Sequence, residues 1–273
     1  MCFFTSLSAN AAAVAKRYGK QLDIIEAARQ ILAEQEQTER AKQEADPKHK
    51  VSVYDIRLAE DIYVIPAYAE PQCVIVSGSN ELQVMQWGLI PPTAKSEDAE
   101  RFDRENLFKN ARAETLFEKW PWRMLWQHNR CIIPVTGFFE PHRLPGGKAQ
   151  YYYTTLKGQE IFSIAGLWDE WTNPQSGVKL QSFVLITTAA NAMMRKIHNG
   201  GNNPFRMPKI LTPEQEQLWL DPKIASEEAV AALLTVFPEK EMIAWPVRQK
   251  FNYGSPFDES IVQPVAEVQD LSL

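Results

Sequence analysis

Short runs of β-branched, aromatic and other apolar residues recur through the middle of the chain, and they constrain its fold more than any other feature. Turn-forming stretches rich in Gly, Pro, Ser and Asn separate several of these runs. Such spacing is typical of antiparallel strands joined by short loops. We therefore predict a mainly antiparallel sheet, with strands at 63–65, 73–76, 82–87, 131–135, 151–155, 161–168 and 182–188.

Helical patterns flank this strand-rich region. Apolar residues at helical spacing begin at Leu22 and lead into a polar run, which predicts a helix over 21–45 within a helical insertion at 21–50. The order Thr212, Pro213, Gln215 has the form of a capping box and predicts a helix start there. A second short helix is expected over 226–235, and residues 257–273 are expected to form a loose tail.

The composition is that of an ordinary globular protein. No apolar run approaches 18 residues and no secretory leader is recognisable, so we expect a cytoplasmic protein with no membrane partner. The three cysteines are odd in number and show no paired spacing, and the four histidines are scattered. We therefore expect neither a disulfide framework nor a metal or other cofactor.

A net charge of -5 argues against a protein that coats duplex DNA by charge alone. A local basic groove is still compatible with this balance. Residues 193–211 and 119–133 carry lysines and arginines but no carboxylate. Such stretches suit a phosphate-facing surface, although they also occur on ordinary solvated faces.

Cys2 stands directly after the initiating methionine. Removal of Met1 would leave an α-amine with a pKa of about 7.7 to 8.0 beside a thiol with a pKa of about 8.5. An amine of this kind condenses with an aldehyde to a Schiff base, and the neighbouring thiol can then close a five-membered thiazolidine. Taken alone, a cysteine at this position is more often incidental.

Four further stretches occur in a fixed order with Met1-Cys2: residues 110–115, 137–140, 197–198 and 206–208. The ordered set, read as NARAET, GFFE, IH and RMP, resembles the SOS-response-associated peptidase (SRAP) family of abasic-site-processing proteins. The similarity extends from Cys2 to about Val247 and includes the segments 63–66, 86–91, 186–191 and 245–247. It implies one α+β domain over 1–273, with a mainly antiparallel, bifurcated or barrel-like β-sheet core surrounded by helices.

The resemblance also implies a function in the response to DNA damage. Members of the family link an N-terminal cysteine to the ring-opened sugar of an abasic site in single-stranded DNA. We therefore expect an SOS-response protein that forms a covalent link with DNA, after an autoprocessing peptidase step or an aminopeptidase has removed Met1. Abasic-site lyase activity is a further expectation. The expected partner is single-stranded DNA containing abasic sites, bound by a monomer that is nucleoid-associated when on DNA.

By this resemblance the catalytic residues are Cys2, Asn110, Glu140 and His198. Cys2 is the crosslinking nucleophile and Asn110 orients its amine or the sugar. Glu140 and His198 handle protons, because a partly buried carboxyl and an imidazole both titrate near neutral pH. The DNA-binding residues are Arg112, Thr188 and Arg206.

The chain departs from the family pattern at several positions. Phe3 and Phe4 replace the Gly-Arg that follows the cysteine in many relatives, and Pro141 replaces the tryptophan after the glutamate. No tandem tryptophan follows Trp87-Gly88, and residues 199–205 are an insertion. Trp120, Trp122 and Phe205 are candidates for the missing base-stacking ring.

Two other functions remain open from the residues alone. One is a cysteine peptidase or amidohydrolase that uses Cys2 with His198 on a peptide or amide substrate. The other is a single-strand-binding module without catalytic activity. Turnover of a peptide would favour the first, and binding without a covalent product would favour the second.

Overall fold

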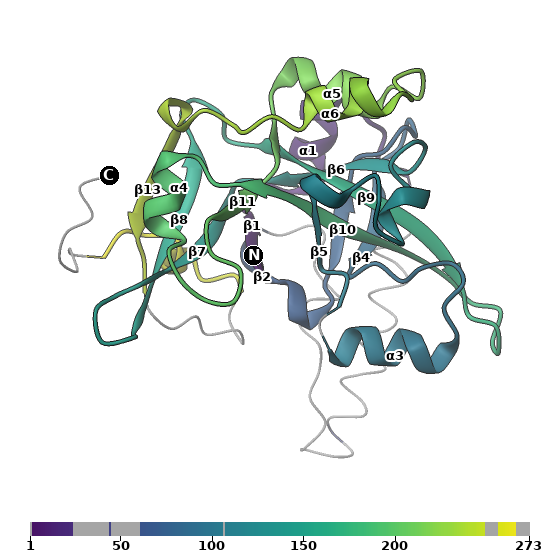
Figure 1. The fold of residues 1–273 in the computed structure, drawn as a ribbon, viewed down its shortest axis with the longest axis horizontal. Helices are drawn as coiled ribbons and strands as arrows, with labels where there is room; N and C mark the ends of the chain where they lie inside the picture. The colour runs from purple at the N-terminus through teal and green to yellow at the C-terminus, as the bar shows by residue number, and fades with distance from the viewer. Residues whose placement is uncertain (1, 24–43, 45–60, 106, 249–255, 266–273) are drawn as a thin grey trace.

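The computed structural model describes residues 2–23, 44, 61–105, 107–248 and 256–265. Most of the expected helix over 21–45, and of the insertion at 21–50, lies outside the described residues. The described chain forms two β-sheets flanked by short helices, as Figure 1 shows, which confirms the expected α+β class with mainly antiparallel pairing. Neither sheet, as formed by the described strands, closes into a barrel.

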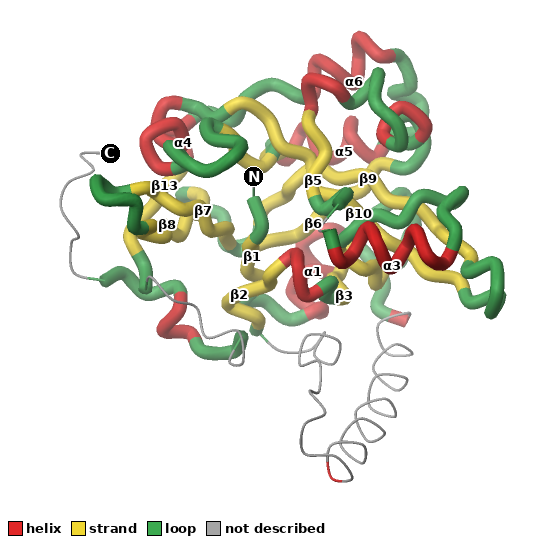
Figure 2. The backbone as a smooth tube through the Cα atoms, turned by 60° about the horizontal axis from the view of Figure 1, so that its bottom comes forward, coloured by secondary structure: helices red, strands yellow, loops and turns green. Residues whose placement is uncertain are grey.

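The smaller sheet has five strands in the order β13-β8-β7-β1-β2, and every neighbouring pair in it is antiparallel. Its strands are β1 (Phe4–Leu7), β2 (Ile62–Pro66), β7 (Gly137–Arg143), β8 (Ala149–Leu156) and β13 (Met242–Pro246). In both views β1 lies between the group of β7, β8 and β13 and the strands of the larger sheet (Figures 1 and 2). The residue after the initiating methionine is thereby brought to the centre of the fold.

The larger sheet has eight strands and branches around β10. Along its length β10 pairs antiparallel with β9 and then β11, and parallel with β4 and then β5. This change of partners is the bifurcation expected of the core. The strands are β3 (Gln72–Ile75), β4 (Gln83–Trp87), β5 (Asn110–Arg112), β6 (Arg130–Val135), β9 (Phe162–Thr172), β10 (Lys179–Ala189), β11 (Arg206–Pro208) and β12 (Ile210–Leu211).

Short helices cover these sheets. Thr212 caps α5 through a complete capping box with Gln215, and Ser226 caps α6, so both expected helix starts are confirmed. The described α-helices are α1 (Ala11–Tyr18), α3 (Ser96–Arg104), α4 (Ala192–Ile197), α5 (Pro213–Leu220) and α6 (Glu227–Leu233). Single 3₁₀ turns occur at η2 (Ala67–Ala69), η3 (Ala113–Thr115), η4 (Trp122–Met124), η5 (Glu239–Glu241) and η6 (Glu259–Ile261).

The first part of the expected loose tail is packed. Ile261 is 2% exposed, and the Trp245 indole donates to the Val262 carbonyl at 2.7 Å. The Val265 amide also donates to the Pro246 carbonyl at 2.9 Å, at the end of β13. The expectation of a loose segment is therefore wrong for 257–265, because an apolar side chain and two hydrogen bonds hold it; residues 266–273 lie outside the described part of the chain.

Candidate functional site

Cys2 directly precedes the strand that pairs with the one carrying Glu140: β1 begins at Phe4, and Glu140 lies in β7. In the antiparallel register of β1 and β7, Phe4 pairs with Phe139. The Cys2 side chain is fully buried, and its Sγ donates to the Phe4 carbonyl at 3.5 Å. Burial, and the nearby Glu140 carboxyl group, raise the pKa of the Cys2 thiol well above its ordinary value. The folded environment therefore keeps this thiol protonated at neutral pH.

Glu140 is a fully buried carboxyl group in the middle of β7, opposite Tyr152 of β8. Neither of its oxygens has a hydrogen-bond partner among the described residues. Burial raises the pKa of Glu140 to about 7. A carboxyl group in this state can give or take a proton near neutral pH.

His198 faces Glu140 from the end of helix α4. Asn191 caps the start of this helix by accepting from the Met194 amide, and the His198 amide closes its last turn on the Met194 carbonyl. The His198 Nδ1 lies 3.7 Å from Glu140 Oε2 and donates to the Arg206 carbonyl at 3.0 Å. Burial lowers the pKa of His198 to about 4, so the imidazole is neutral where Glu140 is half protonated.

A buried polar network fixes β1 against β7 and β8. The Ser6 hydroxyl lies 3.0 Å from the Thr136 hydroxyl and 2.9 Å from the Tyr153 hydroxyl. The Tyr153 ring lies over Gly137, where a Cβ atom would come within 2.1 Å of the ring. Glycine at 137 therefore permits the close packing that holds β1, which begins two residues after Cys2, in register.

Asn110 approaches from the larger sheet. It begins β5, which runs parallel to β10 with Asn110 opposite Leu185. Both polar atoms of its amide are buried and have no hydrogen-bond partner within the described chain. An amide in this state costs free energy unless a ligand binds it, so its position favours a binding role.

The three expected DNA contacts differ in accessibility. Arg112 is exposed, and its guanidinium donates to the Asn203 side chain. Thr188 is 5% exposed on β10, opposite Met207. Arg206 is 9% exposed, forms a two-point ion pair with Glu114, and donates to the Thr187 carbonyl at 2.8 Å. Of the three, Arg112 is best placed to meet a phosphate.

The inserted segment 199–205 joins the two halves of the candidate site. The Asn199 side chain accepts from the backbone amide of Arg143 at 2.7 Å, at the end of β7, while Asn203 contacts Arg112 at the end of β5. The Phe205 amide donates to the His198 carbonyl at 2.8 Å, which closes the loop. This insertion therefore links the Glu140 side of the site to the Arg112 side.

In the two stretches that carry lysines and arginines but no carboxylate, 119–133 and 193–211, some of the basic side chains are buried and others are exposed. Lys209 is 1% exposed, and Arg130 donates to four backbone carbonyls at the end of α5 and near η4. The charges left at the surface are Arg195, Lys196, Lys119 and Arg123. Among the candidate stacking rings, Trp120 and Phe205 are 47% and 42% exposed, whereas Trp122 is 6% exposed and packs on Phe108.

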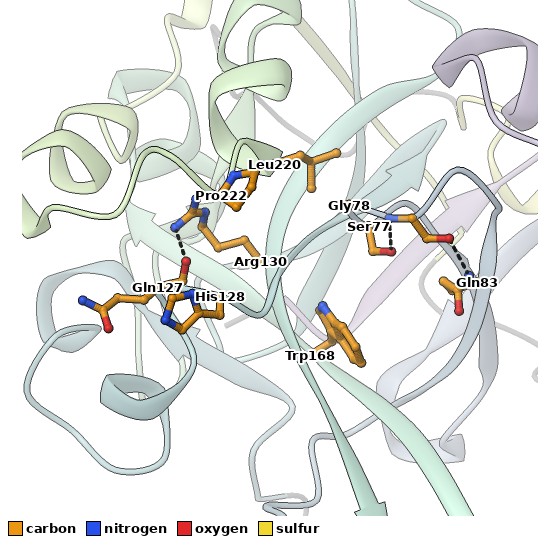
Figure 3. Close-up of a pocket in the computed structure, with 10 residues that line it drawn as sticks. Ser77, Gly78, Gln83, Gln127, His128, Arg130, Trp168, Leu220 and Pro222 are labelled. Atoms are coloured by element: carbon orange, nitrogen blue, oxygen red, sulfur yellow. Dashed lines mark hydrogen bonds between the residues drawn. The ribbon is translucent and has the colours of Figure 1, made fainter.

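A separate cavity of about 370 Å³ lies between the β3–β4 turn, Trp168 and the end of α5 (Figure 3). Arg130 lines it together with Gln127 and His128, and none of the expected site residues does. Within the described residues, no group of three or more His, Cys, Asp or Glu is arranged to hold a metal ion. In the same part of the chain, no helix is long and apolar enough to span a membrane.

Comparison with known proteins connects this geometry to one family. The model of the family described as SOS response associated peptidase (SRAP) matches residues 1–253. The chain is 38% identical over 180 residues to abasic site processing protein YoqW of Bacillus subtilis (strain 168), covering 66% of this chain and 75% of that protein. It is 30% identical to abasic site processing protein HMCES of Xenopus tropicalis over 53% of this chain and 46% of that protein.

Solved structures show the same architecture. A crystal structure of a protein from Bacteroides thetaiotaomicron matches with a TM-score of 0.81 and 35% identity, over 97% of this chain and 100% of that one. A protein from Bordetella bronchiseptica matches with a TM-score of 0.59 and 26% identity, over 66% of this chain and 85% of that one. The likeness therefore extends over the smaller sheet, the larger sheet and the flanking helices.

Proposed function

This chain belongs to the SOS response associated peptidase (SRAP) family, and we propose that it processes abasic sites in single-stranded DNA by bonding to them through Cys2. The proposal rests on the convergence of Cys2, Glu140 and His198, three buried groups from separate segments of the chain. The names of the relatives in Bacillus subtilis and Xenopus tropicalis, both abasic site processing proteins, support the same substrate.

The reaction begins once Met1 has been removed, by the chain itself or by an aminopeptidase. The free Cys2 amine adds to the aldehyde carbon of the ring-opened sugar, and loss of one water molecule gives a Schiff base. The Cys2 thiol then adds to the imine carbon, and its proton passes to the nitrogen. The product is a thiazolidine in which sulfur and nitrogen are both bonded to the former aldehyde carbon.

Glu140 and His198 divide the proton transfers. With a pKa raised to about 7, Glu140 supplies a proton to the departing hydroxyl and takes one back from the amine or thiol. His198, whose pKa is lowered to about 4, is neutral at this pH and acts as an acceptor. The same acceptor would serve β-elimination at the 3′ phosphate, which is the route to lyase activity.

Binding groups surround this centre on the side of the larger sheet. The buried amide of Asn110, which lacks a partner among the described residues, is proposed to hold the amine or the sugar oxygen. Arg112 would contact the backbone phosphate from the surface, with Thr188 beside it on β10. Arg206 is already paired with Glu114, so we assign it mainly to holding the His198 loop and only secondarily to DNA.

Exposed aromatic rings supply contacts that do not depend on sequence. Trp120 and Phe205 remain candidates for stacking on bases of the bound strand, since each is more than two-fifths exposed. Trp122 is withdrawn from this role because it is buried. Recognition would then depend on the aldehyde of the lesion and on an unpaired strand.

A denaturing gel with an oligonucleotide that contains one abasic site tests the proposal. The processed wild-type protein should shift the DNA covalently, and Cys2→Ala should not. Equal shifts in both would remove Cys2 from the reaction. Binding without any covalent shift would indicate an inactive binding module, and repeated turnover of a peptide would indicate a peptidase.

A further inference from the structure

A second histidine lies close to the candidate site and takes no part in the chemistry proposed above. His142 follows Glu140 by two residues on β7, so the two side chains lie on the same face of the sheet. The His142 ring meets the ring of Tyr152 on β8 edge to face, with centroids 6.1 Å apart and an interplanar angle of 80°. Helix α4, which ends directly before His198, lies beside these two strands in both views (Figures 1 and 2).

The His142 imidazole attaches the end of α4 to β7. Its Nδ1 lies 2.9 Å from the Lys196 carbonyl oxygen and 3.3 Å from that of Ile197. A carbonyl oxygen only accepts hydrogen bonds, so this nitrogen carries the hydrogen and donates it. The last four carbonyls of a helix have no partner within the helix, and a donor from another element both satisfies them and fixes the position of the helix end. The turn directly before His198 is therefore held by the strand that carries Glu140.

A second contact holds the segment on the other side of His198. The backbone amide of Arg143 donates to the Asn199 side chain at 2.7 Å, and the Asn199 side-chain nitrogen donates back to the Arg143 carbonyl at 3.2 Å. His142 and Arg143 are consecutive on β7, whereas their partners precede and follow His198 in the sequence. The end of β7 thus contacts the His198 segment on both sides of the imidazole.

These contacts decide how far His198 lies from Glu140. The distance of 3.7 Å between Glu140 Oε2 and His198 Nδ1 is longer than a hydrogen bond, so no bond between the two groups sets it. Two hydrogen bonds of His198, to the Met194 and Arg206 carbonyls, join it to α4 and β11 and not to β7. The separation of the two groups therefore depends on how α4 is held against β7. A displacement of about 1 Å at a catalytic group can cost about 100-fold in rate.

We propose that His142 is a positioning residue for the reaction at Cys2: the hydrogen bond from its Nδ1 to the end of α4 sets His198 at its working distance from Glu140. This role rests on the proposed function and adds to it a residue outside the expected catalytic set. What it requires at position 142 is a donor at the place of Nδ1. Asparagine supplies one, because its amide nitrogen is as many bonds from the backbone as Nδ1 is, whereas leucine has a similar size and no donor.

Single-turnover crosslinking separates this role from folding and from DNA binding. The processed wild type, His142→Asn and His142→Leu react with an excess of a single-stranded oligonucleotide that contains one abasic site, over a range of DNA concentrations. At saturating DNA, His142→Leu should react on the order of 10- to 100-fold more slowly than the wild type, and His142→Asn should stay close to the wild-type rate. The final yield of adduct and the DNA concentration that gives half the maximal rate should be the same in all three.

His128→Leu is the matched control, because His128 is an exposed histidine that lines the separate cavity. It should react as the wild type does. Equal rates for His142→Asn and His142→Leu, whether fast or slow, would overturn the proposal, because the donor would then make no difference. So would a loss confined to the half-saturating DNA concentration, which would make His142 a DNA contact. Should His142→Leu fail to fold, a folded His142→Asn that reacts far more slowly than the wild type would also overturn it.

A second measurement does not depend on crosslinking. Glu140→Gln is introduced into His142→Asn and into His142→Leu, and urea unfolding at pH 5 and pH 8 gives the stability gained. Because burial raises the pKa of Glu140 to about 7, this gain should increase with pH. The increase should be smaller in His142→Leu, where α4 is no longer held on β7 and water reaches the carboxyl group.

Neither variant has a titratable group at position 142, so a difference between them reports on Glu140. An equal increase in both would contradict the positioning role. If the wild type forms no adduct with abasic DNA while this difference persists, the proposed function fails but the positioning of α4 by His142 stands.

Discussion

Glu140 Oε2 and His198 Nδ1 lie 3.7 Å apart, and burial shifts their pKa values in opposite directions, to about 7 and about 4. In free solution a histidine holds its proton to a higher pH than a glutamate does. Here the order is reversed, so up to about pH 7 a proton on this pair resides on the carboxyl group and not on the imidazole. The pair is therefore arranged as a neutral acid beside a neutral base, as pKa tuning in other active sites achieves.

Glu140 should make the protein less stable as the pH rises. Between its ordinary value of 4.5 and about 7, the folded state binds the Glu140 proton more tightly than the unfolded state does. The free energy of unfolding therefore falls through this window. Glu140→Gln, which cannot titrate, should gain stability relative to the wild type by an amount on the order of 3 kcal/mol between pH 5 and pH 8.

Urea unfolding of both proteins at the two pH values measures this difference. His198 contributes in the opposite direction, because a group whose folded pKa is lowered loses stability as the pH falls through 6.5 toward 4. This contribution changes between pH 6.5 and pH 5, but His198 is present in both proteins, so it cancels in the difference between Glu140→Gln and the wild type. A constant difference between Glu140→Gln and the wild type would contradict the raised pKa.

Asn110 should show opposite effects on stability and activity. Its buried amide has no hydrogen-bond partner in the described residues, so replacing it with leucine removes a polar group that folding has already desolvated. We expect the melting temperature of Asn110→Leu to stay level or rise, and its crosslinking rate to fall on the order of 100-fold. A large loss of stability would show instead that the amide has a structural role.

Gly137 should be intolerant of any side chain. In Gly137→Ala the new methyl group would overlap the Tyr153 ring, which also hydrogen-bonds Ser6. We expect a loss of about 3 kcal/mol in the free energy of unfolding, at the upper end for overpacking. Gly78→Ala is the matched control, since nothing lies within 4 Å of a Cβ atom there. Equal stability of the two variants would contradict the close packing of β8 on β7.

Arg112 and Arg206 should separate DNA binding from stability. Arg112→Ala removes an exposed charge. A plot of the logarithm of the affinity for single-stranded DNA against the logarithm of the salt concentration should therefore become shallower by about 0.7.

Arg206→Ala leaves Glu114 and the Thr187 carbonyl without their donor, and should lower the free energy of unfolding by about 1–3 kcal/mol. If Arg206→Ala changed the salt dependence of DNA binding and left the stability unchanged, Arg206 would be a phosphate contact instead.

Much of the fold follows from local sequence patterns. Each predicted strand is present, because alternating apolar residues between turns have few other conformations. The short strands β1, β11, β12 and β13 were not predicted, since pairing with other segments of the chain stabilises them. The strand around Glu140, β7, continues through Pro141, because Pro141 pairs with Tyr151 of β8.

The candidate site could be predicted only in part. Cys2, Glu140 and His198 were identified by the order of their motifs, and the structure brings them together. The pairing of Arg206 with Glu114, 92 residues apart, has no local signature in the sequence.

Chemical trapping of the adduct formed by Cys2→Ser, compared with that of the wild type, tests the proposed chemistry most directly. Serine keeps the amine but removes the thiol, so Cys2→Ser should form only a reversible Schiff base that survives denaturation after borohydride reduction. The processed wild type should give an adduct that needs no reductant, with a mass equal to protein plus DNA less one water. A reductant-independent adduct of equal yield from Cys2→Ser would contradict thiazolidine formation at Cys2.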